Sequence, residues 1–188
     1  MTAVTRSPST HQLLNSPGAA FHEPCEMLLA CHDRVLRMLG LMERLLGHIR
    51  SQGADRQARD AARDLIRYFD LAAPAHHEDE ERHLLPRLRT VGQGELADQL
   101  QREHQAMNQA WRCARESLTQ VAEGRCTPQV LERASADWPR LQDLYGPHVE
   151  LENSVAYGVA RASMDDEQRE AMGREMAQRR GVAYPEMA

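Results

Sequence analysis

The chain has 188 residues, a mild net charge of −5 and few aromatic residues. Its length suits one well-buried domain and is short for two. Leu, Ala, Glu, Gln and Arg are frequent, and no stretch alternates apolar and polar residues as a half-buried strand would. All 23 basic residues are arginines scattered among acids, which argues against a nucleic-acid partner. We therefore expect an all-α protein.

The compartment is predicted from what the chain lacks. The first twenty residues hold no continuous apolar run such as a signal peptide needs, and no later run has the length that spans a bilayer. We expect a cytoplasmic protein with no membrane partner, and the residues identify no protein partner.

The cysteines lack C-x-x-C spacing and are expected to be free thiols. They are Cys25, Cys31, Cys113 and Cys126.

The first expected elements are a flexible arm and a helix. Residues 1–20 are rich in Ser, Thr, Pro and Gly, which is typical of a flexible arm. A helix can begin at Pro24, because proline suits the first helical turn. Its apolar seam advances by four and three residues and includes one histidine, His32. Gly53 marks its end.

Three more long helices are expected after it. The second starts after Asp55, bends before Pro74 and continues to about residue 89, and the turn contains Gly92. The third repeats the apolar seam around His104, and the fourth begins after the capping residue Thr127. The sequence thus predicts an antiparallel up-down four-helix bundle over residues 21–163. Residues 164–188 should form a short extra C-terminal helix, packed on the bundle, and a tail.

The residues 75–86, AHHEDEERHLLP, are too polar for an ordinary core helix. They contain two pairs spaced by four, His76 with Glu80 and His77 with Glu81, and each pair lies on one face of a helix. We expect only one pair to face inward. His148 and Glu152 repeat the same spacing on the fourth helix.

A tandem repeat favours the first pair. The spacing from His32 to His76 is 44 residues, and the spacing from His104 to His148 is the same. The two halves are offset by 72 residues, and His76 keeps this register whereas His77 breaks it by one. His76 and Glu80 are therefore the expected inward pair, with His77 and Glu81 as the alternative.

Six ionisable residues would then converge in one core: His32, His76, Glu80, His104, His148 and Glu152. Unpaired, a buried carboxylate costs several kcal/mol, so a metal site is expected. Four imidazoles and two carboxylates exceed the ligands of one transition metal and suit two metals bridged by the carboxylates. Zinc prefers fewer ligands, and calcium and magnesium prefer oxygen, so we expect two non-haem irons, with manganese less favoured.

This set of motifs resembles the hemerythrin-like, or HHE cation-binding, domains over about residues 22–163. The resemblance rests on the lone His32 and His104, on the two His-x-x-x-Glu pairs, and on the Leu-Leu-Pro that follows the first pair. It implies a four-helix bundle holding an oxo- or hydroxo-bridged di-iron pair. Members of the family bind or sense O2, handle iron, or repair iron centres damaged by NO.

One position departs from the oxygen-carrying hemerythrins, which have a second histidine four residues from the one on the third helix. Asn108 stands there in this chain. The missing ligand could be Asn108, His77, Glu103 or water. We expect the iron bound by His104 to be the less saturated one and to accept a diatomic ligand.

Three functions remain open from the sequence. A binding protein would take O2 or NO reversibly at the open iron position. An enzyme or iron donor would use the same irons against NO or peroxide or to restore damaged iron centres, helped by proton-bearing groups expected near the site: Tyr145, Tyr157, Glu81 and Glu103. The third is a metal-free helical scaffold that binds a partner through its C-terminal helix.

Overall fold

The computed structural model describes residues 21–184, so the expected arm over residues 1–20 and the last four residues of the tail lie outside the described part. Between residues 21 and 184 every regular element is a helix and there is no strand. The all-α prediction is confirmed for this part of the chain. Within it, no helix combines the length and apolarity that crossing a membrane requires.

In the described part of the chain, the helices join end to end into four long rods, with one short helix after them. The first rod is α2 (Pro24–Gln52). The second is α3 (Arg56–Arg67), η1 (Tyr68–Ala72), α4 (Ala73–Asp79), η2 (Glu80–Leu84) and α5 (Leu85–Thr90), where η marks a π-helical turn. The third is α6 (Gly94–Ala122). The fourth is α7 (Pro128–Leu151), η3 (Glu152–Ala156) and α8 (Tyr157–Ala162), and α9 (Asp166–Arg179) comes last.

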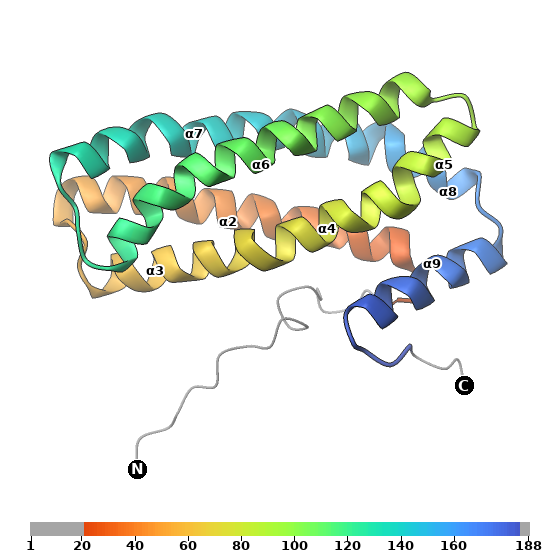
Figure 1. Ribbon diagram of the computed structural model, residues 1–188, viewed down its shortest axis with the longest axis horizontal. Coiled ribbons are helices and arrows are strands. Elements are labelled where there is room, and N and C mark those ends of the chain that lie inside the picture. Colours follow the sequence, from red (N-terminus) through yellow and green to blue (C-terminus); the bar gives the residue numbers. More distant parts are fainter. Residues whose placement is uncertain (1–20, 185–188) are drawn as a thin grey trace, which may run out of the picture.

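The four rods lie side by side, and α9 lies outside them at the end that carries α5 and α8 (Figure 1). Helix α2 packs against α3 and α7, while α6 packs against α3, α5 and α7. Each rod therefore has two neighbours, which closes the four into a ring. The ring encloses a single interior that side chains from all four rods can reach.

Residues at the turns mark where several helices begin and end, at positions that the sequence predicts. The Asp55 carboxylate accepts a hydrogen bond from the backbone N–H of Ala58, and the Thr127 hydroxyl oxygen caps α7 in the same way. Gly92 has φ +81°, a conformation that only glycine adopts without strain. These caps fix where one rod ends and the next begins.

The π-helical turns stand next to the residues of interest. The bend expected before Pro74 takes the form of η1, and η2 comes directly before α5, which has Pro86 in its first turn. Two of the three turns begin at a candidate ligand, η2 at Glu80 and η3 at Glu152. Such one-turn insertions are frequent at functional sites, because they re-aim side chains without ending the helix. Helix α7, by contrast, runs unbroken through its two internal prolines.

The apolar core is divided into two clusters. One contains Val35, Met107 and Trp111 and fills the ring from there to the α3–α7 end, while the other contains Leu28, Leu84 and the inner side of α9. Along α2 and α6, residues of the two clusters stand on either side of His32 and His104. A layer of buried polar groups therefore separates two apolar regions, and little water can approach it from either end.

Helix α9 is fastened to the second rod by charge. Asp79, which is fully buried, accepts hydrogen bonds from Arg179 and Arg180. Gly173 faces the backbone of Phe21 so closely that a Cβ there would meet the Phe21 carbonyl oxygen at 1.8 Å. The buried ion pairs and the backbone contact hold α9 in one position on the bundle.

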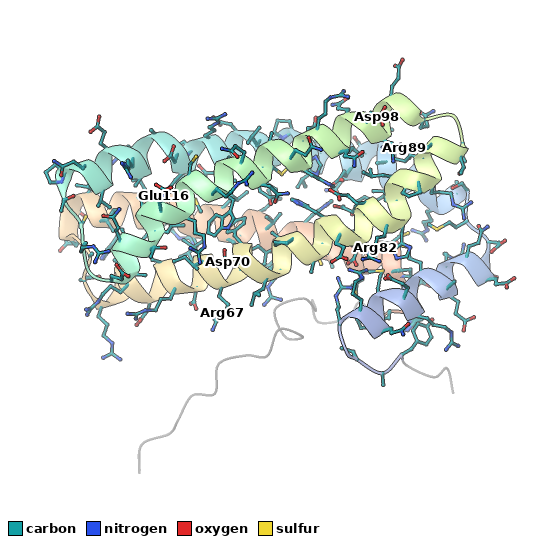
Figure 2. All side chains as sticks on the ribbon, in the orientation of Figure 1. Arg67, Asp70, Arg82, Arg89, Asp98 and Glu116 are labelled. Atoms are coloured by element: carbon teal, nitrogen blue, oxygen red, sulfur yellow. The ribbon has the colours of Figure 1, made fainter. Side chains whose placement is uncertain are left out.

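Most other charges lie on the outer faces of the rods (Figure 2). Arg89 and Asp98, for example, form an ion pair of 2.9 Å between α5 and α6. Exposed pairs of this kind contribute up to about 1 kcal/mol of stability. The exterior is thus solvated, and the buried charges of the described residues include the polar layer and the contact of Asp79 with Arg179 and Arg180.

Candidate metal centre

Every rod contributes to the buried polar layer. The six residues expected from the sequence all lie in it and are 0–7% exposed. They are His32 from α2, His76 from α4, Glu80 from η2, His104 from α6, His148 from α7 and Glu152 from η3. The structure thus brings all six together from positions up to 120 residues apart.

Their potential ligand atoms form two compact groups. In each group, one atom from every member lies within 4.8 Å of the others. The first group is His32, His76, Glu80 and Glu152, and the second is Glu80, His104, His148 and Glu152. Both groups contain both carboxylates, which is the arrangement that two cations bridged by carboxylates require.

Glu80 stands between the two groups. Its Oε1 is 3.2 Å from Nε2 of His76, and its Oε2 is 3.4 Å from Nε2 of His104. The hydroxyl of Tyr157, from the start of α8, donates a hydrogen bond to Oε1. Each oxygen therefore faces a histidine of a different group, and Tyr157 fixes the orientation of the carboxylate.

Glu152 occupies the equivalent position on the fourth rod. Its Oε2 is 3.1 Å from Nε2 of His32 and 3.2 Å from Nε2 of His148. Burial opposes ionisation of Glu152, but the close contacts with these two imidazoles outweigh it and lower the pKa of the carboxyl group. The same contacts outweigh burial in His32 and His148 and raise the pKa of both. Glu152 is thus an anion that attracts positive charge.

Three of the histidines are oriented by oxygen atoms outside the layer. Each uses Nδ1 for this contact, so that Nε2 points to the carboxylates. With the distance from Nδ1 to the accepting oxygen, the pairs are His32 and Asn153 at 2.7 Å, His104 and Glu81 at 3.1 Å, and His148 and Glu103 at 2.7 Å. A proton held on Nδ1 leaves a lone pair on Nε2, as in metal-bound histidines.

The inward atoms of the layer lack hydrogen-bond partners within the described part of the chain. They include Nε2 of His32, His104 and His148, Oε2 of Glu80 and both carboxylate oxygens of Glu152. Buried polar atoms without partners are costly, of the order of 1–3 kcal/mol each. Imidazole and carboxylate lone pairs that converge in this way are the donor set of a transition-metal site, so these residues fit a bound metal.

Charge in the layer is balanced by protons when no cation is bound. Burial disfavours protonation of His104, but its close contacts with the carboxylates of Glu80 and Glu81 outweigh burial and raise the pKa to about 10. Burial lowers the pKa of His76, and it lowers that of His77 further. The layer therefore needs positive charge, and it retains neutral imidazoles that can bind a metal.

His77 corrects one expectation from the sequence. Only one of the two pairs in residues 75–86 was expected to face inward, but His76 and His77 are both buried, at 7% and 4% exposed. The His76 ring lies 4.9 Å from that of His32, whereas the His77 ring stacks on His104 at 4.1 Å. The second rod borders two other rods, so two adjacent histidines, about 100° apart on the helix, can each face one of them.

His77 also belongs to a third group of potential ligand atoms. One ring nitrogen of His77 lies within 4.8 Å of ligand atoms of His104 and His148. Its Nδ1 is buried without a hydrogen-bond partner in the described residues, and its Nε2 lies 3.5 Å from the Tyr145 hydroxyl. For the two carboxylates, the structure agrees with the expectation that Glu80 faces inward and Glu81 does not: Glu80 is fully buried, and the Glu81 side chain is 41% exposed.

Asn108, one of the four candidates for the missing ligand, does not face the layer. The inward seam of α6 runs from His104 to Met107 and Trp111, and Asn108 is exposed. Glu103 does approach the layer, but it accepts a hydrogen bond from His148 at Nδ1, the nitrogen that points away from the carboxylates. Of the candidates in the sequence, His77 is the one whose ring enters the layer.

Asn153 is the orienting residue that the sequence did not reveal. Its side chain reaches His32 across 121 positions of the chain, and its place beside Glu152 in η3 is the only local signal. The proton-bearing groups expected near the site all contact it. These are Tyr145 with His77, Tyr157 with Glu80, Glu81 with His104, and Glu103 with His148.

Comparison with known proteins gives one family and one relative. Residues 23–176 match the family model of the hemerythrin HHE cation binding domain. The chain is 28% identical over 167 residues to an uncharacterized protein of Haemophilus influenzae, covering 87% of this chain and 94% of that protein. The matched residues include every member of the buried polar layer.

Proposed function

The chain belongs to the hemerythrin HHE cation-binding family, and on that premise we propose that it is a non-haem di-iron protein that reversibly binds or senses O2 or NO at an open iron position. The observation that carries the proposal is the pair of four-residue groups that share Glu80 and Glu152. In this proposal the four rods are the antiparallel up-down bundle expected from the sequence, and residues 21–163 are the unit that holds the metal.

Iron is favoured over other metals by the mixture of ligands. Imidazole nitrogens and bridging carboxylates together exceed what tetrahedral zinc accepts, and calcium and magnesium prefer oxygen ligands. Manganese is the second choice. When bound, a pair of irons would supply reversible binding of a diatomic molecule.

We assign His77 as the seventh ligand. The metal held by His104 and His148 would then have three imidazoles and two carboxylate oxygens, whereas the metal held by His32 and His76 would have one imidazole fewer. With the bridging oxygen expected from the sequence, the first would be six-coordinate and the second five-coordinate. We therefore place the open position on the iron near His32 and His76, and not on the iron near His104 as expected from the sequence.

Side chains around the proposed open iron position limit access of water and hold Glu80 in one orientation. The apolar cluster that contains Leu28 and Leu84 covers one side of the layer and limits access of water. Tyr157 keeps a proton on its hydroxyl, because burial and the neighbouring carboxylates raise its pKa well above the usual value. It can therefore hold Glu80 in place with a hydrogen bond while a small ligand enters and leaves.

Reversible binding is tested with the reduced and oxidised protein. We expect the optical spectrum of the reduced protein to change on exposure to O2 or NO and to return when the gas is removed. Azide should perturb the spectrum of the oxidised protein. Spectra that do not respond to any of these ligands would contradict an open position.

The alternative is a di-iron enzyme or iron-donating protein in defence against nitrosative or oxidative stress. It is favoured by the Tyr157 hydroxyl, which carries a proton, and by the carboxylates of Glu81 and Glu103, which contact site histidines and suit proton exchange during turnover. Continuous consumption of NO or peroxide by the reduced protein, instead of saturation at one molecule per site, would establish this alternative.

The role of His77 is tested by substitution. We expect His77→Ala to weaken binding of one of the two irons by about tenfold to a hundredfold, because one imidazole ligand is lost while both carboxylates remain. The matched control is Asn108→Ala, which should bind two irons as the unchanged protein does, since Asn108 faces solvent. Metal titration with a chromogenic chelator measures both variants. Equal affinities in His77→Ala and the unchanged protein would remove His77 from the ligand set.

A further inference from the structure

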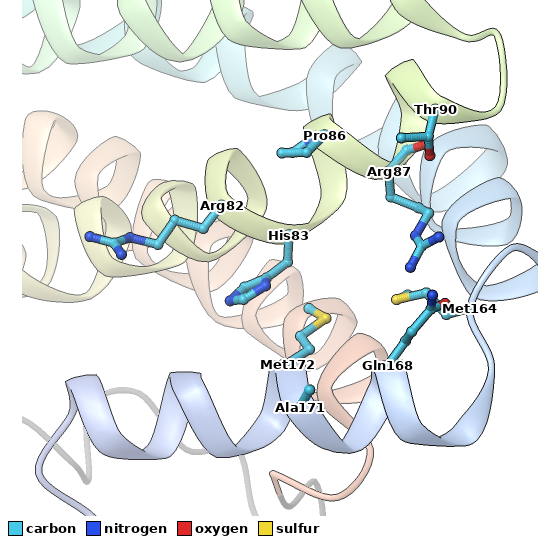
Figure 3. A pocket seen from close by; sticks show the side chains of 9 residues that line it. All are labelled: Arg82, His83, Pro86, Arg87, Thr90, Met164, Gln168, Ala171 and Met172. Atoms are coloured by element: carbon cyan, nitrogen blue, oxygen red, sulfur yellow. The ribbon is translucent and has the colours of Figure 1, made fainter.

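A cavity lies outside the ring, between the second rod and α9 (Figure 3). Residues of η2 and α5 form one wall, and Met164, Gln168, Ala171 and Met172 form the other. Its volume is about 450 Å³, which is in the range of small-molecule sites, roughly 300–1,000 Å³. The cavity shares no residue with the buried polar layer, so a ligand could bind in it whether or not the metal centre is occupied.

The cavity has a basic wall in which one cation lacks a partner. Arg82 and His83 both contact Glu175 of α9, at 3.6 and 2.7 Å. Arg87 forms no ion pair with any residue between 21 and 184, and no carboxylate is among the described residues that line the cavity. Figure 3 shows the Arg87 guanidinium extending toward α9, next to Gln168 and Met164. Its charge is therefore available to an anion that enters the cavity.

The rest of the lining is largely apolar. Met164 and Met172 are 9% and 4% exposed and form its inner surface, together with Pro86 on the opposite wall. Methionine side chains are flexible and polarisable and adapt to apolar ligands of different shape. Ala171 leaves space that a larger side chain at the same position would fill.

We propose that this cavity binds a small organic carboxylate, whose carboxylate group pairs with Arg87 and whose apolar body lies against Met164 and Met172. A guanidinium can bind a carboxylate through two parallel N–H···O bonds. An inorganic anion would satisfy the charge but leave the apolar surface exposed to water. The combination of one unpaired cation and an apolar floor favours an amphipathic anion.

Binding is tested with octanoate and the full-length protein by isothermal titration calorimetry. We expect one octanoate per chain, about tenfold weaker binding of the neutral analogue octanamide because the charge-assisted contact is lost, and no measurable binding of inorganic phosphate. Absence of octanoate binding up to millimolar concentration would overturn the proposal, as would equal affinities for octanoate and octanamide.

Two variants locate the ligand. Arg87→Met keeps an apolar side chain without the charge and should weaken octanoate binding about tenfold or more, while the control Arg102→Met removes an exposed arginine of α6 and should not change it. Ala171→Phe, at an exposed helical position, should fill the cavity and abolish binding. Circular dichroism and thermal melting check that all three variants fold. Octanoate binding that survives in both folded Arg87→Met and folded Ala171→Phe would show that the ligand lies elsewhere.

Discussion

Replacing Glu152 with alanine is expected to remove both irons from the protein. Glu152 belongs to both four-residue groups, and its Oε2 lies close to a histidine of each, His32 and His148. A bridging carboxylate serves two cations at once, so its loss weakens both metal sites. The charged groups that remain in the layer would then be buried without their partner. Metal analysis after gel filtration should give less than about a tenth of the iron bound by the unchanged protein.

The matched control is Glu150→Ala, two residues earlier on the same rod. Glu150 is exposed, so its removal changes the net charge equally but leaves the buried layer intact. We expect the full metal content in this variant. If Glu152→Ala instead kept one of two irons, the carboxylate would be a terminal ligand of a single metal and the bridged arrangement would be wrong.

Removal of metal is expected to destabilise the fold. Without cations, the carboxylates and imidazoles of the layer must share protons in a buried space, and several inward atoms have no partner among the described residues. A metal held at a thousand times its dissociation constant adds about 4 kcal/mol of stability. For a chain of this size, that corresponds to a drop of about 10 °C in melting temperature on chelation.

Thermal melting followed by circular dichroism, with and without a strong chelator, measures this difference. Adding iron back to the metal-free protein should restore the higher melting temperature, which separates metal loss from irreversible damage. A metal-free protein as stable as the metal-loaded one would mean that these side chains gain little from cations.

The sequence predicted the residues of the layer because their spacing is regular. Apolar seams on α2 and α6 continue in register on both sides of His32 and His104, and the equal 44-residue spacings relate these to His76 and His148. Helical periodicity then determines which face each residue occupies, and all of these histidines are buried in the structure. Local rules of this kind need no knowledge of how the rods pack.

The features that the sequence did not reveal depend on packing between rods. Whether His77 is buried depends on the rod beside it, which the sequence of its own helix does not show. Asn153 is an ordinary polar residue until η3 brings it beside His32. The contacts of Asp79 with Arg179 and Arg180 likewise join residues 100 and 101 positions apart, and no local pattern predicts them.

The most direct test of the di-iron centre is the iron content of the purified full-length chain, measured together with its Mössbauer spectrum after expression in iron-replete medium. The shared carboxylates predict two irons per chain, magnetically coupled and in two different environments, since His77 gives one iron an additional imidazole. A chain that contains no iron, a single zinc, or one uncoupled iron would contradict this centre.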